Sequence, residues 1–353
     1  MLSMHRTSFI FACLIVLCCG FTSLLHERSN ETIHAKDANR YMWDQLHQGN
    51  YDSIQQIITQ LKTAWYQSPD DAKLNTHLGF IYLWKFCERG RKDPDPLVFQ
   101  NIFTSNFFFK RAIELNPDDA RLYSLQAATE ICEGAIRKDV LKISKGYRTG
   151  HEAVGKWPQF NRFALAAIES MMDKNSSLFH EGLRYQWITM DECSCKHLSK
   201  KEILKHPDKV ISGLIDELQN STDPKIKRAC WNSWIAPHNF EGYLLNFGDM
   251  LVKQGKLEEA KKVYTAIKLA PSYSEWVYKT ALEKRITDVS VNEKLFNRKL
   301  NLLFDKGEPQ IFINSQISCV ACHQMNPEEF KRYGYQEPGD ETYSIDRRTR
   351  PGS

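Results

Sequence analysis

Five residues near the carboxyl end have the types and spacing that covalent haem attachment requires. They read Cys319-Val320-Ala321-Cys322-His323. Two thiols separated by two residues can each form a thioether to one vinyl group of the same porphyrin, and the histidine that follows can ligate the iron from one side. We therefore predict one haem c per chain, attached through Cys319 and Cys322, with His323 as an axial ligand of the iron.

The same pentapeptide is compatible with a structural disulfide or with half of a zinc site. In the disulfide alternative, Cys319 pairs with Cys322 and His323 has no special role. The chain would then be a haem-free adaptor or assembly factor. A wide apolar slot and a residue facing His323 would favour haem, whereas a disulfide needs only paired sulfur atoms.

The ligand on the opposite side of the iron is not identified by spacing. Met325 is chemically suitable, because methionine is a common axial partner. It lies only two residues from His323, however, and cannot easily reach the opposite face of the haem. Other histidine and methionine side chains come from the predicted helical body: His77, His151, His180, His238, Met190 and Met250. With none of them at the iron, the site is five-coordinate and can bind a small ligand or peroxide.

A second cysteine cluster contains Cys193, Cys195 and His197. A Cys-x-Cys pair with a nearby histidine suits copper or zinc, so the cluster is a second candidate metal site. In an exported protein, disulfides are the alternative. In that case Cys193 and Cys195 would each form a disulfide with Cys87, Cys132 or Cys230. Together these five cysteines are odd in number, which implies a free thiol, an intermolecular bond or a metal ligand.

The amino terminus predicts export. His5 and Arg6 precede an apolar run from Phe9 to Cys19, which has the length of a signal-peptide core. We expect residues 1–25 to be a signal peptide cleaved after Gly20, with an uncleaved membrane anchor and a lipidated cysteine as alternatives. We predict that the protein is located in the bacterial periplasm, either as a free protein or anchored to the membrane and facing the periplasm. Its only membrane contact would be through this segment. A net charge of +4 with mixed signs does not indicate a nucleic-acid binder.

Helices must position the motif, because long stretches of 3.6-residue periodicity and only 17 glycines predict an all-α chain. One unit has a large-small pair, a turn glycine, a small residue and a closing proline. Its residues are Phe247-Gly248, Leu251, Gly255, Leu257, Ala260, Tyr264, Ile267 and Pro271. This unit resembles the tetratricopeptide repeat, whose residues carry packing, not catalysis. The resemblance implies a right-handed solenoid of helical hairpins with a concave surface for a peptide or protein partner.

Two weaker matches to the repeat lie nearer the amino terminus. One begins at Leu78-Gly79 and resumes at Phe109, with a loop inserted near 86–100. The other contains Gly49-Asn50-Tyr51 and ends at Ser68-Pro69-Asp70. The motif Pro-Asp-Asp-Ala occurs at the end of each of these two units and marks a boundary between repeats.

The predicted organisation has repeats over 26–130, a divergent helical region over 131–237, and a repeat with a following helix over 238–305. The haem segment follows over 306–335 and a polar tail over 336–353. Helices are expected at 160–172, 207–218 and 287–304, and from Asn326-Pro327 onward. Because the chain resembles cytochromes c only at the motif, the repeat domain must supply the rest of the haem pocket.

These features predict an exported helical protein that carries one haem c and docks a protein partner, which can itself be a redox protein. The haem would transfer single electrons or sense a small ligand. No phosphate loop, nucleophile elbow or His-Glu-x-x-His motif is present. The chain is therefore not assigned as an enzyme, and a peroxidase-like activity would require an open iron site.

Overall fold

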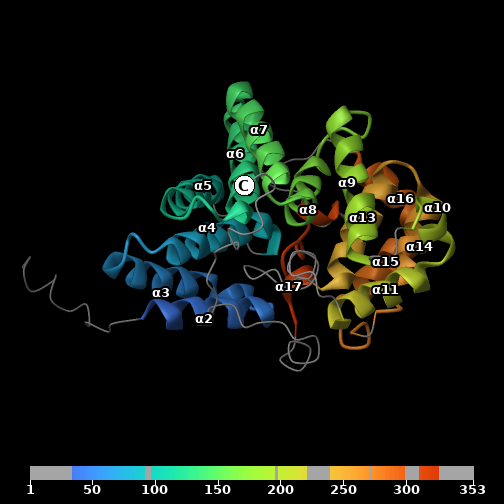
Figure 1. Ribbon diagram of the computed structural model, residues 1–353, viewed down its shortest axis with the longest axis horizontal. Coiled ribbons are helices and arrows are strands. Elements are labelled where there is room, and N and C mark those ends of the chain that lie inside the picture. Colours follow the sequence, from blue (N-terminus) through green and yellow to red (C-terminus); the bar gives the residue numbers. More distant parts are fainter. Residues whose placement is uncertain are drawn as a thin grey trace, which may run out of the picture. The chain divides into compact units, whose positions relative to one another are not determined.

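The computed structural model describes residues 34–91, 97–194, 198–220, 239–270, 272–298 and 310–325. Within these ranges every regular element is a helix, which confirms the all-α prediction (Figure 1). The described residues from Ala35 onward belong to one compact unit. The predicted signal segment, the helix expected from Asn326 and the polar tail lie outside the described residues.

The first described part of the chain consists of helical hairpins. Its elements are α2 (Ala35–His47), η1 (Tyr51–Ser53), α3 (Ile54–Gln67), α4 (Ala72–Cys87), η2 (Arg89–Arg91) and α5 (Val98–Leu115). The turn after α2 requires Gly49, whose φ of 67° lies in the left-handed region. The loop expected near 86–100 separates α4 from α5, and its residues 92–96 lie outside the described ranges.

The two Pro-Asp-Asp-Ala motifs begin helices, as their predicted role as boundaries requires. The Asp71 carboxylate accepts hydrogen bonds from the backbone N–H groups of Lys73 and Leu74 at the start of α4. Asp119 accepts from the N–H of Arg121 at the start of the next helix. Each aspartate thus satisfies N–H groups that have no partner within the helix.

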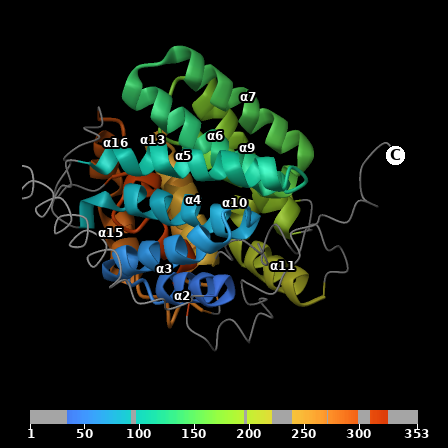
Figure 2. The same ribbon diagram turned by 90° about the vertical axis from the view of Figure 1, so that its left-hand side faces the viewer.

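Glycines allow close approach of paired helices in two of the predicted repeats. α4 and α5 pack against each other, and a Cβ at Gly79 would lie 2.7 Å from the Phe109 ring (Figure 2). In the later repeat, a Cβ at Gly248 would overlap the Tyr264 ring. In both repeats, an aromatic ring of the partner helix therefore packs against the glycine of the predicted large-small pair.

The middle region continues as packed helices. They are α6 (Ala120–Arg137), α7 (Val140–Lys156), α8 (Pro158–Glu169), α9 (Ser177–Ser194), α10 (Lys200–Lys205) and α11 (Pro207–Asn220). α6 packs against α7, and α8 packs against α9. The helix expected at 160–172 begins two residues earlier, with Pro158 in its first turn, where a missing N–H has no cost.

The last described part contains α13 (Phe240–Lys253), α14 (Leu257–Ile267), α15 (Lys279–Thr287), α16 (Val289–Phe296), η3 (Phe312–Asn314) and α17 (Val320–His323). The helix expected over 287–304 begins as α16 at Val289, directly after a break from α15, and ends at Phe296; its part beyond residue 298 lies outside the described residues. The break lies at Asp288, whose backbone departs from helical geometry (φ −98°, ψ 20°). This bend lets Leu282 and Val289 both enter the apolar core.

Helix α13 is the centre of this last part. Nearly all of its residues are buried, and it packs against α14, α16 and α17. The short helix α17 also packs against α2, so it contacts both the beginning and the end of the described chain. None of the helices in the described ranges is long and apolar enough to span a bilayer.

Candidate functional site

The predicted haem motif forms the short helix α17 and the residue before it. Cys322 and His323 are buried, with 3% and 5% of their surface exposed, and Cys319 is partly exposed. Both cysteines are free thiols, so no disulfide joins them in this structure. The three residues predicted to hold haem are therefore on one turn of helix, and no disulfide joins the two cysteines.

A carboxylate from a distant part of the chain caps this helix. The backbone N–H groups of Cys319 and Val320 both donate to Oε1 of Glu88, at 2.8 and 2.9 Å. Its second oxygen accepts from Arg91 at 2.9 Å. Burial raises the pKa of the Glu88 carboxyl, and these hydrogen bonds oppose that rise. Glu88 follows α4 directly, so the end of α4 fixes the start of α17.

The other side of α17 lies against the start of α13. A Cβ on Gly242 would be 2.5 Å from Sγ of Cys322 and 2.7 Å from the carbonyl oxygen of Ala321. The N–H of Asn239 donates to the carbonyl of Cys322 at 2.8 Å, and the indole N–H of Trp276 donates to that of Ala321 at 3.2 Å. Because Gly242 has no side chain, the backbone of α13 packs directly against the Cys322 sulfur.

The His323 imidazole contacts one end of a chain of aromatic rings. Its imidazole meets Phe80 edge to face, with ring centroids 5.8 Å apart, and Phe80 in turn contacts Trp43 at 5.6 Å. Trp43 also stacks on His47, at 5.7 Å. The imidazole of His323 therefore lies in a largely aromatic environment formed by α2 and α4.

The structure brings a second histidine, His47, toward this environment. The N–H of Met325 donates to the carbonyl of His47 at 3.1 Å, which holds the chain after His323 against the end of α2. His47 is partly exposed as a residue, but its Nε2 is buried. Burial, and secondarily the charge of His323, lower the pKa of His47 to about 3. At neutral pH His47 is therefore a neutral imidazole, the form that binds metals.

The described histidines and methionines that the sequence suggested as the second iron ligand have other contacts. His77 uses both ring nitrogens, since Nε2 accepts from Trp43 at 3.3 Å and Nδ1 lies 2.5 Å from the side-chain oxygen of Asn39. His180 is exposed beside Gln254. The remaining described candidates are His151, which lies beside Glu181, and Met190, Met250 and Met325, which are in the apolar core. His238 lies outside the described residues.

The second predicted metal site also falls mostly outside the described residues. Cys195 and His197 are not described, and Cys193 is in the last turn of α9. No contact of this cluster is therefore known, and it stays a prediction.

Two further cysteines lie near the motif. The thiols of Cys87 and Cys319 are hydrogen-bonded, and this contact and burial raise the pKa of Cys319. Burial, and then the neighbouring Cys87, raise the pKa of Cys132 to about 12. All three are free thiols. Cys87 comes from the end of α4, and no sequence spacing links it to the motif.

The donor chemistry around α17 fits a covalently attached haem. Two thiols without a disulfide partner, a buried imidazole and a second neutral imidazole lie on or near α17, and Gly242 lets the backbone of α13 pack against one sulfur. These are the attachment and ligand groups that haem c requires. His47, Glu88 and Gly242 complete the arrangement, although none of them was singled out by the sequence.

No protein-family model matches this chain, and no curated protein matches it. The chemistry of α17 and of its neighbours is consequently the main support for a function.

Proposed function

We propose that this chain is an exported protein of tetratricopeptide-like helical hairpins that carries one covalent haem c. The haem serves in single-electron transfer, or in sensing a small ligand, with a docked protein partner. The observation that carries this proposal is the placement of Cys319, Cys322 and His323. Both thiols are free, and the imidazole is buried among aromatic rings next to His47.

Four residues have distinct roles in holding the haem. Cys319 and Cys322 would provide the thioether sulfurs, and His323 and His47 would ligate the iron. A haem held in this way would supply an iron centre that accepts and releases one electron. Ligation by two imidazoles would favour electron transfer over the binding of peroxide or other small ligands.

Neighbouring residues position this ligand set. Glu88 orients the amino end of α17 through two N–H groups, and Gly242 allows α13 to approach the Cys322 sulfur. Phe80 and Trp43 keep water away from the two imidazoles. A low-dielectric environment of this kind lowers the reorganisation that accompanies a change in charge at the iron, and it tunes the reduction potential.

The tetratricopeptide-like arrangement is supported by the equivalent packing of two helix pairs. Gly79 faces Phe109 in one pair and Gly248 faces Tyr264 in the other, and Ala112 and Ala260 are fully buried. Such hairpins stack into a curved array whose concave side binds a peptide or protein. We place the docking site of the partner on that side.

The test is an absorption spectrum, oxidised and reduced, of protein exported from a host with the machinery for haem c maturation. Wild type is compared with Cys319→Ala/Cys322→Ala, and Cys132→Ala is the matched control that removes a partly buried thiol outside the motif. We expect a Soret band and a reduced α band that resist acid–acetone extraction in the wild type and in Cys132→Ala. Both bands should be absent from the double variant. A colourless wild-type protein would exclude the haem and favour the haem-free adaptor.

A further inference from the structure

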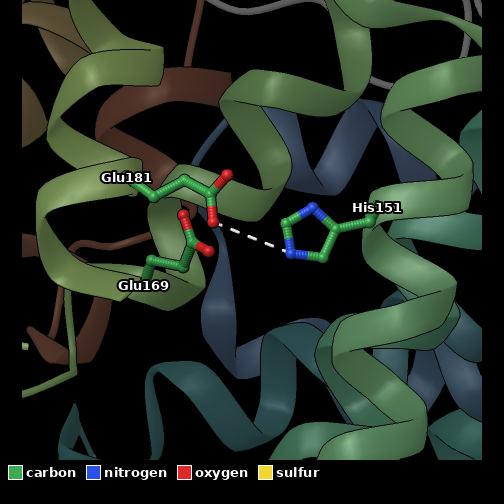
Figure 3. Close-up of side chains that lie close together, drawn as sticks. All are labelled: His151, Glu169 and Glu181. Carbon is green, nitrogen blue, oxygen red and sulfur yellow. Dashed lines mark ion pairs between the residues drawn. The ribbon is translucent and has the colours of Figure 1, made fainter. Parts of the chain in front are cut away.

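Three helices bring a histidine and two glutamates together, away from the haem motif. His151 is on α7, Glu169 is the last residue of α8, and Glu181 is on α9. One ligand atom from each lies within 4.8 Å of the others, and Nε2 of His151 is 3.7 Å from Oε2 of Glu181. Figure 3 shows the three side chains pointing toward a common space.

Glu169 is the unusual member of this group. It is fully buried, and neither of its carboxylate oxygens has a hydrogen-bond partner. A buried carboxylate without a partner is costly, so such groups normally pair with a cation or bind a metal. Gly182 makes room for it, because a Cβ there would be 2.8 Å from Cβ and 3.1 Å from Oε2 of Glu169.

The other groups in this space are also suitable for binding a cation. Glu181 keeps one oxygen toward His151, while its other oxygen accepts from the Tyr185 hydroxyl at 2.9 Å. The hydroxyl of Tyr147 is buried without a hydrogen-bond partner, and its pKa is raised by burial and then by the charge of Glu169. A metal-bound water near Glu169 would give this hydroxyl a partner.

We propose that His151, Glu169 and Glu181 bind one divalent first-row transition-metal ion, for which Zn²⁺ is the reference. One imidazole nitrogen and two carboxylate oxygens form a borderline ligand set that favours such ions over Ca²⁺ and Mg²⁺. Three protein ligands leave a fourth position for water. The bound ion joins α7, α8 and α9, which belong to two successive helix pairs.

To hold the ion, the three ligand atoms must contract from separations of up to 4.8 Å. Ligand atoms that share one Zn²⁺ at about 2.0–2.2 Å are roughly 3.4 Å apart in a tetrahedral site. The present 3.7 Å between His151 and Glu181 is close to that separation. The His151 side chain is 44% exposed, so its ring can turn toward the two carboxylates without disturbing the core.

The experiment measures the thermal unfolding midpoint of the full chain with and without Zn²⁺ and the affinity by calorimetry. Variants are Glu169→Gln and His151→Ala, and His180→Ala is the matched control because His180 is an exposed histidine beside Glu181. We expect Zn²⁺ to raise the midpoint of wild type and of His180→Ala, and to bind at least tenfold more weakly to the other two variants. Glu169→Gln should fold well without metal, because the amide has nearly the size and shape of the buried carboxyl group that it replaces.

Two results would overturn the proposal. One is a midpoint that does not respond to Zn²⁺, Mn²⁺ or Co²⁺. The other is an equal rise in all four proteins, which would place the ion at the cysteine clusters. The absorption of the Co²⁺-loaded protein gives an independent reading, because thiolate charge-transfer bands report cysteine ligands and their absence is expected here.

Discussion

The imidazole pair of His47 and His323 gives the site its most specific property. In the proposed site both axial positions are filled by histidine. Replacing His47 with methionine should raise the reduction potential of the haem, because methionine ligation favours the ferrous state. The rise should be a substantial part of the roughly 0.8 V range that axial ligands span.

Spectroelectrochemical titration measures this potential, and His180→Met controls for adding a methionine at an exposed position. His47→Ala should also open the iron to carbon monoxide. An unchanged spectrum and potential in both His47 variants would show that another residue, such as Met325, ligates the iron.

His77 makes a pH-dependent contribution to stability. Burial, and then the charges of Lys73 and Arg121, lower its pKa to about 3. The unfolded chain therefore binds a proton between about pH 6.5 and pH 3 that the folded chain does not, so stability falls as the pH falls through this range. At pH 5 the loss from this one group is about 2 kcal/mol.

The matching variant is His77→Gln, whose side chain keeps a donor and an acceptor for Asn39 and Trp43. It should be less stable than wild type at pH 7. We expect the difference in free energy of unfolding to shrink by about 2 kcal/mol at pH 5, as measured by urea denaturation. A difference that does not change with pH would contradict the neutral, buried state of this imidazole.

At the residue scale, the sequence predicted the groups that lie close together along the chain. Cys319, Cys322 and His323 are recognisable because their spacing is fixed by the chemistry of one porphyrin. His47 and Glu88 are more than 200 residues away, and only tertiary packing brings them to α17. The cluster of His151, Glu169 and Glu181 was missed for the same reason.

Among the helices, the contact between α13 and α17 depends on one missing side chain. Gly242→Ala places a Cβ against the Cys322 sulfur and against backbone atoms of α17, which cannot move aside easily. We expect a loss of about 1–3 kcal/mol in the free energy of unfolding, with a lower yield of haem-loaded protein. Gly155→Ala is the control, because nothing lies within 4 Å of a Cβ there. That change within α7 should stabilise the protein by about 0.5–1 kcal/mol.

A buried ion pair holds the segment that leads to α17. Arg285 of α15 donates to Asp249 of α13 at 3.0 Å and to the carbonyl of Gln310 at 2.7 Å. Arg285→Ala leaves Asp249 as a buried, unbalanced charge and should cost about 3–5 kcal/mol. Arg285→Met/Asp249→Asn should recover much of this loss, which chemical denaturation can measure. Equal losses in both proteins would mean that the charge of Asp249 is not the cause.

The helices themselves were predictable where caps and periodicity agree. The second aspartate of each Pro-Asp-Asp-Ala motif caps the start of a helix. The glycines of the large-small pairs pack against aromatic rings of the partner helices. The start of α16 at Val289 agrees with the helix expected from Thr287, but α16 already ends at Phe296. The helical pattern continues beyond Phe296, so local sequence alone does not determine this end.

For the whole compact unit, residues 310–325 connect its first and last described helices. Asn314 accepts from Arg89 at 2.9 Å, Gln316 donates to the carbonyl of Gly90 at 2.9 Å, and Met325 donates to that of His47. We therefore expect haem absorbance and far-ultraviolet circular dichroism to report the same unfolding transition in guanidinium chloride. A change in haem absorbance at a clearly lower denaturant concentration than the loss of helical circular dichroism would show that residues 310–325 detach independently.

The burial of the motif has a consequence for how the protein matures. In the folded chain Cys322 has almost no exposed surface, and Glu88 and Asn239 hold the backbone on either side of it. An enzyme that joins porphyrin to thiols needs an extended, accessible strand of substrate. Under the proposed function, haem attachment would precede the docking of α17, so ligation would compete with folding of the chain. A chain that folds first would hide the Cys322 thiol from the haem.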